Sequence, residues 1–274
     1  MTARIAFIGA GNMGRAILGG LLQGGHAAGH LCAADADDGT RTRVAREFGV
    51  ATSASNEQAA AEADVLVLAV KPQQLKDVAR GLAVALAGRR PLVLSIAAGI
   101  STASLASWFG AGTPVVRSMP NTPALIGRGT SALFANAATD AAGRALAENI
   151  MRAVGAVHWL DDEALMDAVT ALSGSGPAYL FRVIECLANA GEALGLAPAL
   201  ARRLALETAA GASELALGSS FDPATLRAQV TSKGGTTEQA LRVLDEGGLC
   251  ELFGSALTAA RDRSRQLAAE FGRE

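Results

Sequence analysis

The chain has 274 residues, of which 50% are hydrophobic and 18% are charged, and its formal net charge is −2 at pH 7. This length suits one large domain or two ordinary ones. The near-neutral charge gives no electrostatic reason to expect a nucleic-acid partner. Uninterrupted apolar runs such as Val65–Val70 are far shorter than the roughly 20 residues of a membrane-spanning helix, so no membrane partner is expected.

The cysteines and histidines do not suggest a metal site. Cys32, Cys186 and Cys250 lie far apart without a C-x-x-C pair, which predicts buried, reduced thiols in a cytosolic protein. The three histidines have no partner at ligand spacing, so neither a zinc site nor a His-based nucleophilic triad is expected. A core strand starts almost at once and no signal peptide is visible, so the expected location is the cytoplasm.

The first motif is a glycine loop between a strand and a helix. Arg4–Ile8 predicts a buried strand, Gly9–Gly14 has the spacing G-x-G-x-x-G, and Arg15–Leu22 has the apolar pattern of a helix. In this context the glycines allow a tight turn, close approach of the backbone to a phosphate and close helix packing. The N-terminus of the helix then faces the anion, which predicts a dinucleotide pyrophosphate site.

The next strand, Leu31–Ala34, ends at Asp35, where an acid can bind the adenosine ribose hydroxyls. That acid favours NAD and would repel the 2′-phosphate of NADP. Arg41 and Arg43 follow in the next predicted helix and could hold that phosphate instead. Asp35 could also be an ordinary turn residue in an acidic loop. The sequence leaves the choice between NADPH and NADH open.

Strands and helices alternate through the rest of the first half. We expect a doubly wound parallel sheet of the Rossmann type, with ligands at the carboxyl ends of its strands. The further strands expected are Asp64–Val70, Pro91–Ile96, Pro114–Arg117, Thr130–Phe134 and Val154–Trp159. Four loops of small residues are expected to converge on one crevice: Gly9–Gly14, Ala69–Pro72, Ala97–Gly99 and Met119–Thr122.

The pattern then changes to helices alone. The expected division is a dinucleotide-binding domain at 1–161 and an all-α domain at 162–274. Helices are expected at about 163–191, 198–218, 222–229, 236–245 and 248–271. Two stretches of small residues interrupt them, Leu172–Tyr179 and Val230–Glu238.

The second interruption can bind an anion. Gly234 and Gly235 allow consecutive backbone N–H groups to point one way, and the helix that follows adds its dipole. A substrate carboxylate would fit there, but an N-cap with a glycine turn explains the same residues equally well. Glu163 is either a helix-start acid or a partner for a cationic substrate nitrogen.

Together these motifs resemble the pyrroline-5-carboxylate reductases over essentially the whole chain. The resemblance is carried by Gly9–Gly14, Ala69–Pro72, Ser95–Gly99, Met119–Pro123, Leu172–Tyr179 and Val230–Thr237, in that order. It implies an NADPH- or NADH-dependent oxidoreductase acting on a CH–NH group, which reduces 1-pyrroline-5-carboxylate to L-proline in the last step of proline biosynthesis. It also implies a homo-oligomer, in which helical domains form a dimer and dimers form a larger ring such as a decamer.

Residue roles follow from the same resemblance. Thr237 is expected to be catalytic, donating toward the ring nitrogen. The substrate is expected to contact Glu163, Ser232, Gly234, Gly235, Thr236 and Thr237. The cofactor is expected to contact Ile8, Gly9, Ala10, Gly11, Asn12, Met13, Gly14, Asp35, Asn56, Ala69, Val70, Lys71, Pro72, Ala97 and Ala98.

Two positions depart from the family, and two other classes of protein compete with it. Lys233 stands where the family usually has proline, and Asp35 replaces a small polar residue. A β-hydroxyacid dehydrogenase would need a lysine on the first helix of the second domain, and this chain has none there. A non-catalytic dinucleotide sensor would have no need of a substrate loop such as Val230–Thr237.

Overall fold

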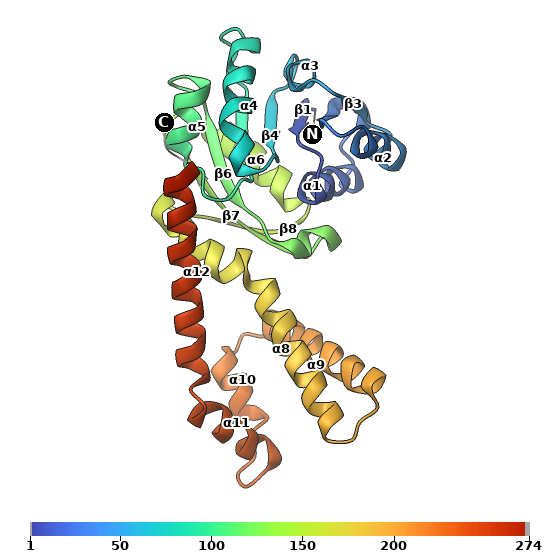
Figure 1. Cartoon of the computed structure of the whole chain (residues 1–274), viewed down its shortest axis with the longest axis vertical. Coiled ribbons are helices and arrows are strands. Elements are labelled where there is room, and N and C mark those ends of the chain that lie inside the picture. Colours follow the sequence, from blue (N-terminus) through green and yellow to red (C-terminus); the bar gives the residue numbers. More distant parts are fainter. Residues whose placement is uncertain (1, 272–274) are drawn as a thin grey trace. The chain divides into compact units, whose positions relative to one another are not determined.

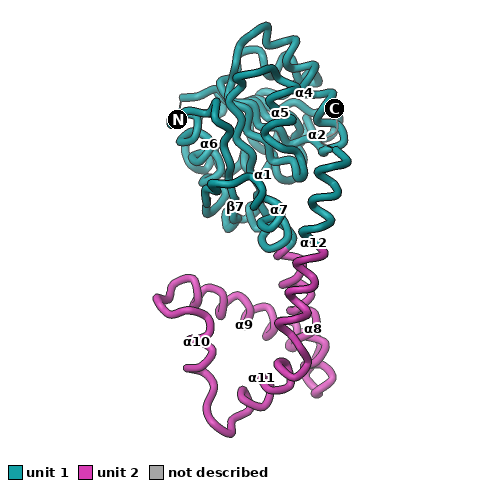
Figure 2. The backbone as a smooth tube through the Cα atoms, turned by 90° about the vertical axis from the view of Figure 1, so that its left-hand side faces the viewer, with its two compact units in different colours: residues 1–175, 260–274 teal, residues 176–259 magenta. Residues whose placement is uncertain are grey.

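The computed structural model describes residues 2–271, and the chain forms two compact units (Figure 2). Unit 1 comprises Met1–Ser175 with Ala260–Glu274, and unit 2 comprises Gly176–Ala259. The last strand ends at Trp159, so strands give way to helices close to residue 161, as expected. The compact units divide later along the chain, because the first helical turns after Trp159 bury side chains such as Met166 and Ala171 within unit 1.

Unit 1 is built on an eight-stranded sheet with the order β3-β2-β1-β4-β5-β6-β7-β8 (Figure 1). Neighbouring strands are parallel except β6 and β7, which are antiparallel. The segment between β6 and β7 is too short for the crossover that a parallel connection needs. The strands are β1 (Ile5–Ile8), β2 (Leu31–Ala34), β3 (Ala51–Ser53), β4 (Val65–Leu68), β5 (Leu92–Ser95), β6 (Val115–Met119), β7 (Gly129–Ala135) and β8 (Gly155–Trp159). The expected doubly wound sheet is confirmed, with β7 and β8 running opposite to the other six.

Helices cover both faces of the sheet, and successive side chains of β1 point into the two cores. Phe7 packs in the core formed with α1, α2 and α6, whereas Ile8 packs in the core formed with α3, α4 and α5. This alternation follows from the two-residue period of a strand that is buried on both faces. The helices are α1 (Asn12–Gln23), α2 (Asp38–Phe48), α3 (Asn56–Ala60), α4 (Pro72–Ala85), α5 (Thr102–Phe109), α6 (Ala141–Arg152) and α7 (Met166–Val169). Shorter helical turns are η1 (Ala28–His30), η2 (Thr122–Ile126), η3 (Glu163–Leu165) and the π-helical turn η4 (Thr170–Gly174).

Unit 2 is entirely helical, as expected, and α8 and α9 pack side by side in it. Its hydrophobic residues are largely exposed in the single chain: among residues 176–259, all of them described, only Ala201 and Ala205 are buried. Leu194 is 87% exposed and Leu217 is 84% exposed. The helices are α8 (Gly176–Ala193), α9 (Pro198–Gly218), α10 (Pro223–Gln229), α11 (Thr236–Glu246) and α12 (Leu249–Phe271), the last of which continues into unit 1.

The cysteines are more exposed than the sequence suggested. Cys32 is half-buried, but Cys186 and Cys250 are exposed. The prediction of buried thiols was wrong for these two because they lie on α8 and α12, where unit 2 has no core of its own. Across residues 2–271, no three His, Cys, Asp or Glu side chains are grouped so that they could hold a metal ion. None of the described helices combines the length and apolarity needed to cross a membrane.

His26 is a buried ionisable group close to the start of β2. Its side chain is 4% exposed, neither ring nitrogen has a hydrogen-bond partner, and its ring lies 6.2 Å from that of His30. Burial is the main cause that lowers the pKa of His26 below its ordinary value of 6.5. The unfolded chain therefore binds a proton at His26 more readily than the folded chain does.

This difference predicts a pH-dependent loss of stability. Above pH 6.5 His26 is neutral in both states, and the difference in pKa does not change the free energy of unfolding. As the pH falls from 6.5 toward the lower folded-state pKa, the unfolded chain takes up the proton first, and the free energy of unfolding decreases. Chemical unfolding at about pH 7.5 and about pH 5.5 should show a smaller loss of stability in His26→Gln than in the original chain. The exposed His158→Gln is the matched control and should behave like the original chain. Equal losses in all three proteins would contradict the prediction.

Candidate functional site

The glycine loop after β1 packs directly against the end of β4. Gly9 has φ +96°, and a Cβ there would lie 2.8 Å from the backbone carbon of Ala69. A Cβ at Gly14 would lie 2.7 Å from the carbonyl oxygen of Gly9. Both positions therefore exclude any other residue, and they bring the start of α1 against two adjacent strand ends.

Gly11 is different, because a Cβ at this position would meet no atom within 4 Å. It is the N-cap residue of α1, with ordinary extended backbone angles, and no side chain caps this helix. The uncapped N–H groups of the first turn thus border open space, next to the positive end of the helix dipole. This arrangement fits a dinucleotide pyrophosphate, which would be held by the free backbone N–H groups at the start of α1, within Gly9–Gly14.

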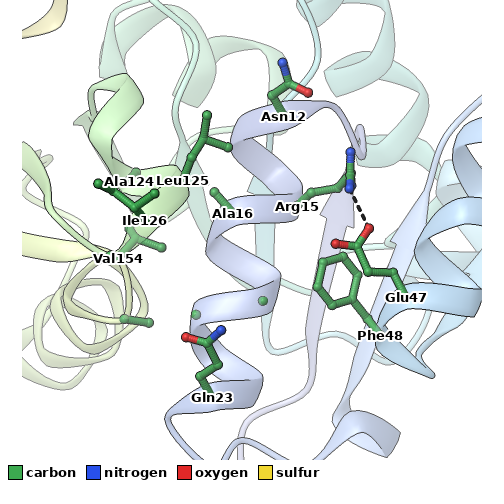
Figure 3. Close-up of a pocket in the computed structure, with 14 residues that line it drawn as sticks. Asn12, Arg15, Ala16, Gln23, Glu47, Phe48, Ala124, Leu125, Ile126 and Val154 are labelled. Carbon is green, nitrogen blue, oxygen red and sulfur yellow. Dashed lines mark hydrogen bonds and ion pairs between the residues drawn. The ribbon is translucent and has the colours of Figure 1, made fainter. Parts of the chain in front are cut away.

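A pocket of about 330 Å³ runs along the same helix (Figure 3). Asn12 and Arg15 of α1 line it together with Phe48 from the end of α2. Arg15 Nη2 and Glu47 Oε2 form an ion pair at 2.5 Å across it, which ties α1 to α2. The pocket therefore borders the glycine loop at Asn12, and the ion pair of Arg15 with Glu47 in its wall holds α1 against α2.

Asp35 follows β2 and contacts the glycine loop directly. Its Oδ2 accepts a hydrogen bond from the backbone N–H of Ala10 at 2.9 Å, and its Oδ1 accepts one from the N–H of Asp37 at 3.0 Å. The carboxylate is thus held at the edge of the loop that would carry the pyrophosphate. Each oxygen keeps a further lone pair with which it can accept from a ribose hydroxyl.

The other residues expected to contact the cofactor lie at the ends of neighbouring strands. The strands β2, β1, β4 and β5 are adjacent and parallel, so their carboxyl ends form one edge. Asn56 begins α3, Lys71 is the N-cap residue of α4, and Ala97 donates its N–H to Ser95 Oγ at 3.3 Å. Unit 1 therefore brings all the predicted cofactor residues to the edge where doubly wound sheets bind ligands.

Glu163 lies in unit 1 and is bound by two residues that the sequence did not single out. Its Oε1 accepts from the N–H of Thr102 at 2.8 Å and its Oε2 from Thr102 Oγ1 at 2.7 Å. Arg117, only 6% exposed, donates from Nη1 to Oε1 at 3.2 Å. The carboxylate thus binds the first turn of α5 and an arginine of β6, and its role toward the substrate stays a prediction.

A second polar contact connects the loop after β6 with the first interruption of the helices. Asn121 Nδ2 donates to the carbonyl oxygen of Ser173 at 3.2 Å, and Asn121 Oδ1 accepts from the N–H of Thr130 at 2.9 Å. Ser173 belongs to the π-helical turn η4, a geometry that is frequent at functional sites. Ser173, and with it the part of Leu172–Tyr179 that belongs to unit 1, is therefore placed by a specific hydrogen bond.

The residues expected to hold the substrate carboxylate lie in unit 2, at the start of α11. Gly234 has φ +73°, and its N–H donates to Glu238 Oε2 at 2.7 Å. The N–H of Gly235 donates to the carbonyl oxygen of Ser232 at 3.0 Å. Both glycine N–H groups are thus satisfied inside the loop, which differs from the expected role of these donors. α11 begins at Thr236 without a side-chain cap, so its first turn still presents free donors.

The fold and this site define a class of protein, a dinucleotide-dependent oxidoreductase with a Rossmann-type sheet followed by a helical unit. Residues 163–267 match the family model for pyrroline-5-carboxylate reductase dimerisation, and residues 4–99 match that for NADP oxidoreductase, coenzyme F420-dependent. The chain is 50% identical to the pyrroline-5-carboxylate reductase of Pseudomonas aeruginosa over 271 residues, which cover 99% of both chains. It therefore belongs to the pyrroline-5-carboxylate reductase family.

Solved structures agree with this assignment. The pyrroline-5-carboxylate reductase of Coxiella burnetii has a TM-score of 0.93 and 44% identity, and the match covers 97% of this chain and 99% of that one. The Plasmodium falciparum pyrroline carboxylate reductase, solved with NADP bound, has a TM-score of 0.86 and 28% identity, with 97% and 98% covered. The predicted family, fold class and NAD(P)H-dependent oxidoreductase activity, which yields proline from pyrroline-5-carboxylate, are confirmed.

The contrast between two glycines gives a test of the cofactor site. Gly11→Ala should fold normally, because its Cβ meets no protein atom, but the methyl group would enter the space for the phosphate. We expect it to weaken NAD(P)H binding by roughly tenfold or more without changing the melting temperature. Gly14→Ala should lower both the affinity for NAD(P)H and the melting temperature, because its Cβ meets the backbone of Gly9. Nicotinamide fluorescence titration and thermal melting measure the two effects. Normal cofactor binding by Gly11→Ala would place the pyrophosphate elsewhere.

Proposed function

We propose that this chain reduces 1-pyrroline-5-carboxylate to L-proline, that the strand-end edge of unit 1 binds the dinucleotide, and that the loop before α11 binds the substrate carboxylate. The observation that supports this proposal best is the uncapped N-terminus of α11 in a chain that belongs to this family. A helix N-terminus attracts a carboxylate, and both substrate and product carry one.

The substrate carboxylate binds the first turn of α11. The free N–H groups of Thr236 and Thr237 and the hydroxyl of Ser232 are the donors available to it. Gly234 and Gly235 do not donate to the substrate. Their N–H groups donate to Glu238 and Ser232 within the loop, and these bonds set the positions of the neighbouring hydroxyl groups. Lys233 is exposed and adds a positive charge beside this loop, which favours an anionic substrate.

Thr237 has the catalytic role. When bound, the dinucleotide would supply a hydride to the carbon of the C=N bond, which becomes C5 of proline, and the electron pair of that bond moves to the ring nitrogen. The Thr237 hydroxyl donates a hydrogen bond to that nitrogen as its lone pair develops, and the amine then takes up a proton. No histidine or lysine is needed, because a protonated cyclic imine is already electrophilic and the site supplies orientation and electrostatics.

Glu163 has a supporting part in this proposal. Its partly buried carboxylate binds Arg117 and Thr102, so it stabilises the start of α5 beside the Ala97–Gly99 loop. A charge on Glu163 would also favour the cationic ring nitrogen. The contacts with Thr102 and Arg117 support the first role, and the second rests on the resemblance of the sequence to the family.

Two variants of Thr237, one that loses the hydroxyl group and one that keeps it, test the role of this residue. The original chain should oxidise NADH or NADPH when pyrroline-5-carboxylate is added, as followed by nicotinamide absorbance. Thr237→Ala should lower kcat by about 10²-fold, in the range seen when a single donor to a developing charge is removed. Thr237→Ser keeps the hydroxyl and should retain most of the turnover. Both variants should bind cofactor normally.

Two results would contradict this proposal. Absence of turnover by the original chain with both cofactors would exclude the reaction. Equal kcat values for Thr237→Ala and Thr237→Ser would remove the hydroxyl from the mechanism.

We propose further that the protein works in the cytoplasm as a homo-oligomer, a dimer assembled into a larger ring such as a decamer. Residues 163–267 match the dimerisation model of the family, and unit 2 exposes large apolar side chains such as Phe181 and Leu252, which are 65% and 68% exposed. Surfaces of this kind are buried in obligate assemblies.

Light scattering measures the assembly directly. We expect a mass that is an even multiple of the chain mass. Phe181→Glu should shift it toward the monomer, because a charge would be buried in the interface. Arg182→Glu changes the neighbouring exposed side chain and serves as the matched control for position on α8. A monomer at micromolar concentration in the original chain would contradict the proposal.

A further inference from the structure

Arg41 is a basic side chain that contacts the loop after β2 directly. Its Nη1 donates to the carbonyl oxygens of Asp35 and Ala36, at 2.7 and 2.9 Å. Its Nη2 donates to Asp38 Oδ1 at 2.8 Å. The Arg41 side chain is 19% exposed. Three hydrogen bonds would have to break before this side chain could turn to a phosphate group.

Asp35 occupies the place where the adenosine ribose is bound in this type of fold. It follows β2 directly, and its Oδ2 accepts from Ala10 N–H within the glycine loop. The carboxylate is therefore fixed from two sides, by Ala10 and by the N–H of Asp37. An ionised carboxylate there accepts hydrogen bonds from the 2′- and 3′-hydroxyls of NADH, whereas the 2′-phosphate of NADPH offers it another negative charge.

Two further carboxylates extend the negative charge along the loop. Asp37 is the N-cap residue of α2 and accepts from the N–H of Thr40 at 2.7 Å. Hydrogen bonding from Thr40 is the main cause that lowers the pKa of Asp37, so this side chain is charged at neutral pH. Asp38 is exposed and paired with Arg41. The loop thus presents three acids with one arginine bound among them.

Arg43 does not replace Arg41. Residues two apart on a helix point away from each other, so Arg41 and Arg43 lie on different sides of α2. Arg43 is exposed, and its charge acts on Asp37. Holding a 2′-phosphate beside Asp35 would require a cation on the same side as Arg41.

We propose that Asp35 and Arg41 make this chain prefer NADH over NADPH. Asp35 binds the unphosphorylated ribose, and Arg41 is a positioning residue that holds the Asp35–Asp38 loop instead of binding the 2′-phosphate. The family model that matches residues 4–99 and a 28% identical relative both point to NADP. The preference for NADH is therefore a property of these local residues and not of the family. The proposal rests on dinucleotide binding by the glycine loop and does not depend on the identity of the imine substrate.

Equilibrium titration of the intact protein with NADH and NADPH, followed by nicotinamide fluorescence, tests the preference without turnover. We expect the Kd for NADH to be at least about tenfold lower than that for NADPH, because like charges would meet at Asp35. Equal affinity, or tighter binding of NADPH, would overturn the proposal. A protein that binds NADH more tightly but reduces no pyrroline-5-carboxylate would contradict the proposed function alone.

Two variants separate the two roles. Asp35→Asn keeps an oxygen to accept from Ala10 N–H but loses the charge, and it should shift the ratio of the two Kd values toward NADPH by about tenfold. Arg41→Ala should weaken both nucleotides by a similar factor, because both need the same loop. A selective loss of NADPH binding in Arg41→Ala would show that Arg41 binds the phosphate and would overturn its positioning role.

The control for these variants is Arg43→Ala. It removes one exposed positive charge from the same helix, so it should leave the ratio of the two Kd values unchanged. A change in that ratio as large as that of Asp35→Asn would mean that general charge, rather than the contact at Asp35, sets the preference. Thermal melting of each variant confirms that it is folded before binding is compared.

Discussion

The close approach of Gly9 and Gly14 to the end of β4 is the constraint on which the candidate cofactor site depends. Neither position has room for a Cβ, because the atoms in the way belong to the backbones of Ala69 and of Gly9 itself. Backbone atoms cannot swing aside as a flexible side chain can, so the spacing of the glycines fixes where α1 begins. The free N–H groups of α1, the Asp35 carboxylate and the Ala69–Pro72 loop all take their positions from this contact.

An ion pair between the buried Arg117 and the half-buried Glu163 plays the corresponding part at β6 and α5. Burying a charge such as that of Arg117 costs several kcal/mol unless it finds a partner, and its partner Glu163 also receives two hydrogen bonds from Thr102. Removing one partner would leave a buried charge, so the pair holds β6, α5 and the first turn after β8 in one arrangement. These elements flank the Ala97–Gly99 loop, so the contacts among Arg117, Glu163 and Thr102 help to determine the shape of the site. Their net contribution to the free energy of unfolding is small, because the cost of desolvating the charges offsets their attraction.

Local patterns in the sequence predicted most of unit 1, whereas contacts between distant residues were missed. Apolar runs, Ser or Asp caps and the glycine spacing are local, and the strands and helices begin and end within a few residues of the predicted positions. The contact of Glu163 with Arg117 joins residues far apart in the chain, and its one local sign was an arginine at the end of an otherwise apolar strand. The contact of Asn121 with Ser173 left no such sign.

The loop before α11 is an intermediate case, because the contact that shapes it has a local sign in the sequence. Glu238 stands three residues after the N-cap Gly235, the spacing at which a glutamate reaches back to a backbone N–H. In the structure it binds Gly234 N–H, so the two glycines shape the loop and the next turn of helix is left to bind a ligand. Glu238 is also negative, and it lies where a substrate carboxylate is proposed to bind. The exposed Lys233 offsets that charge, which gives a physical reason for a lysine in a loop where the family usually has proline.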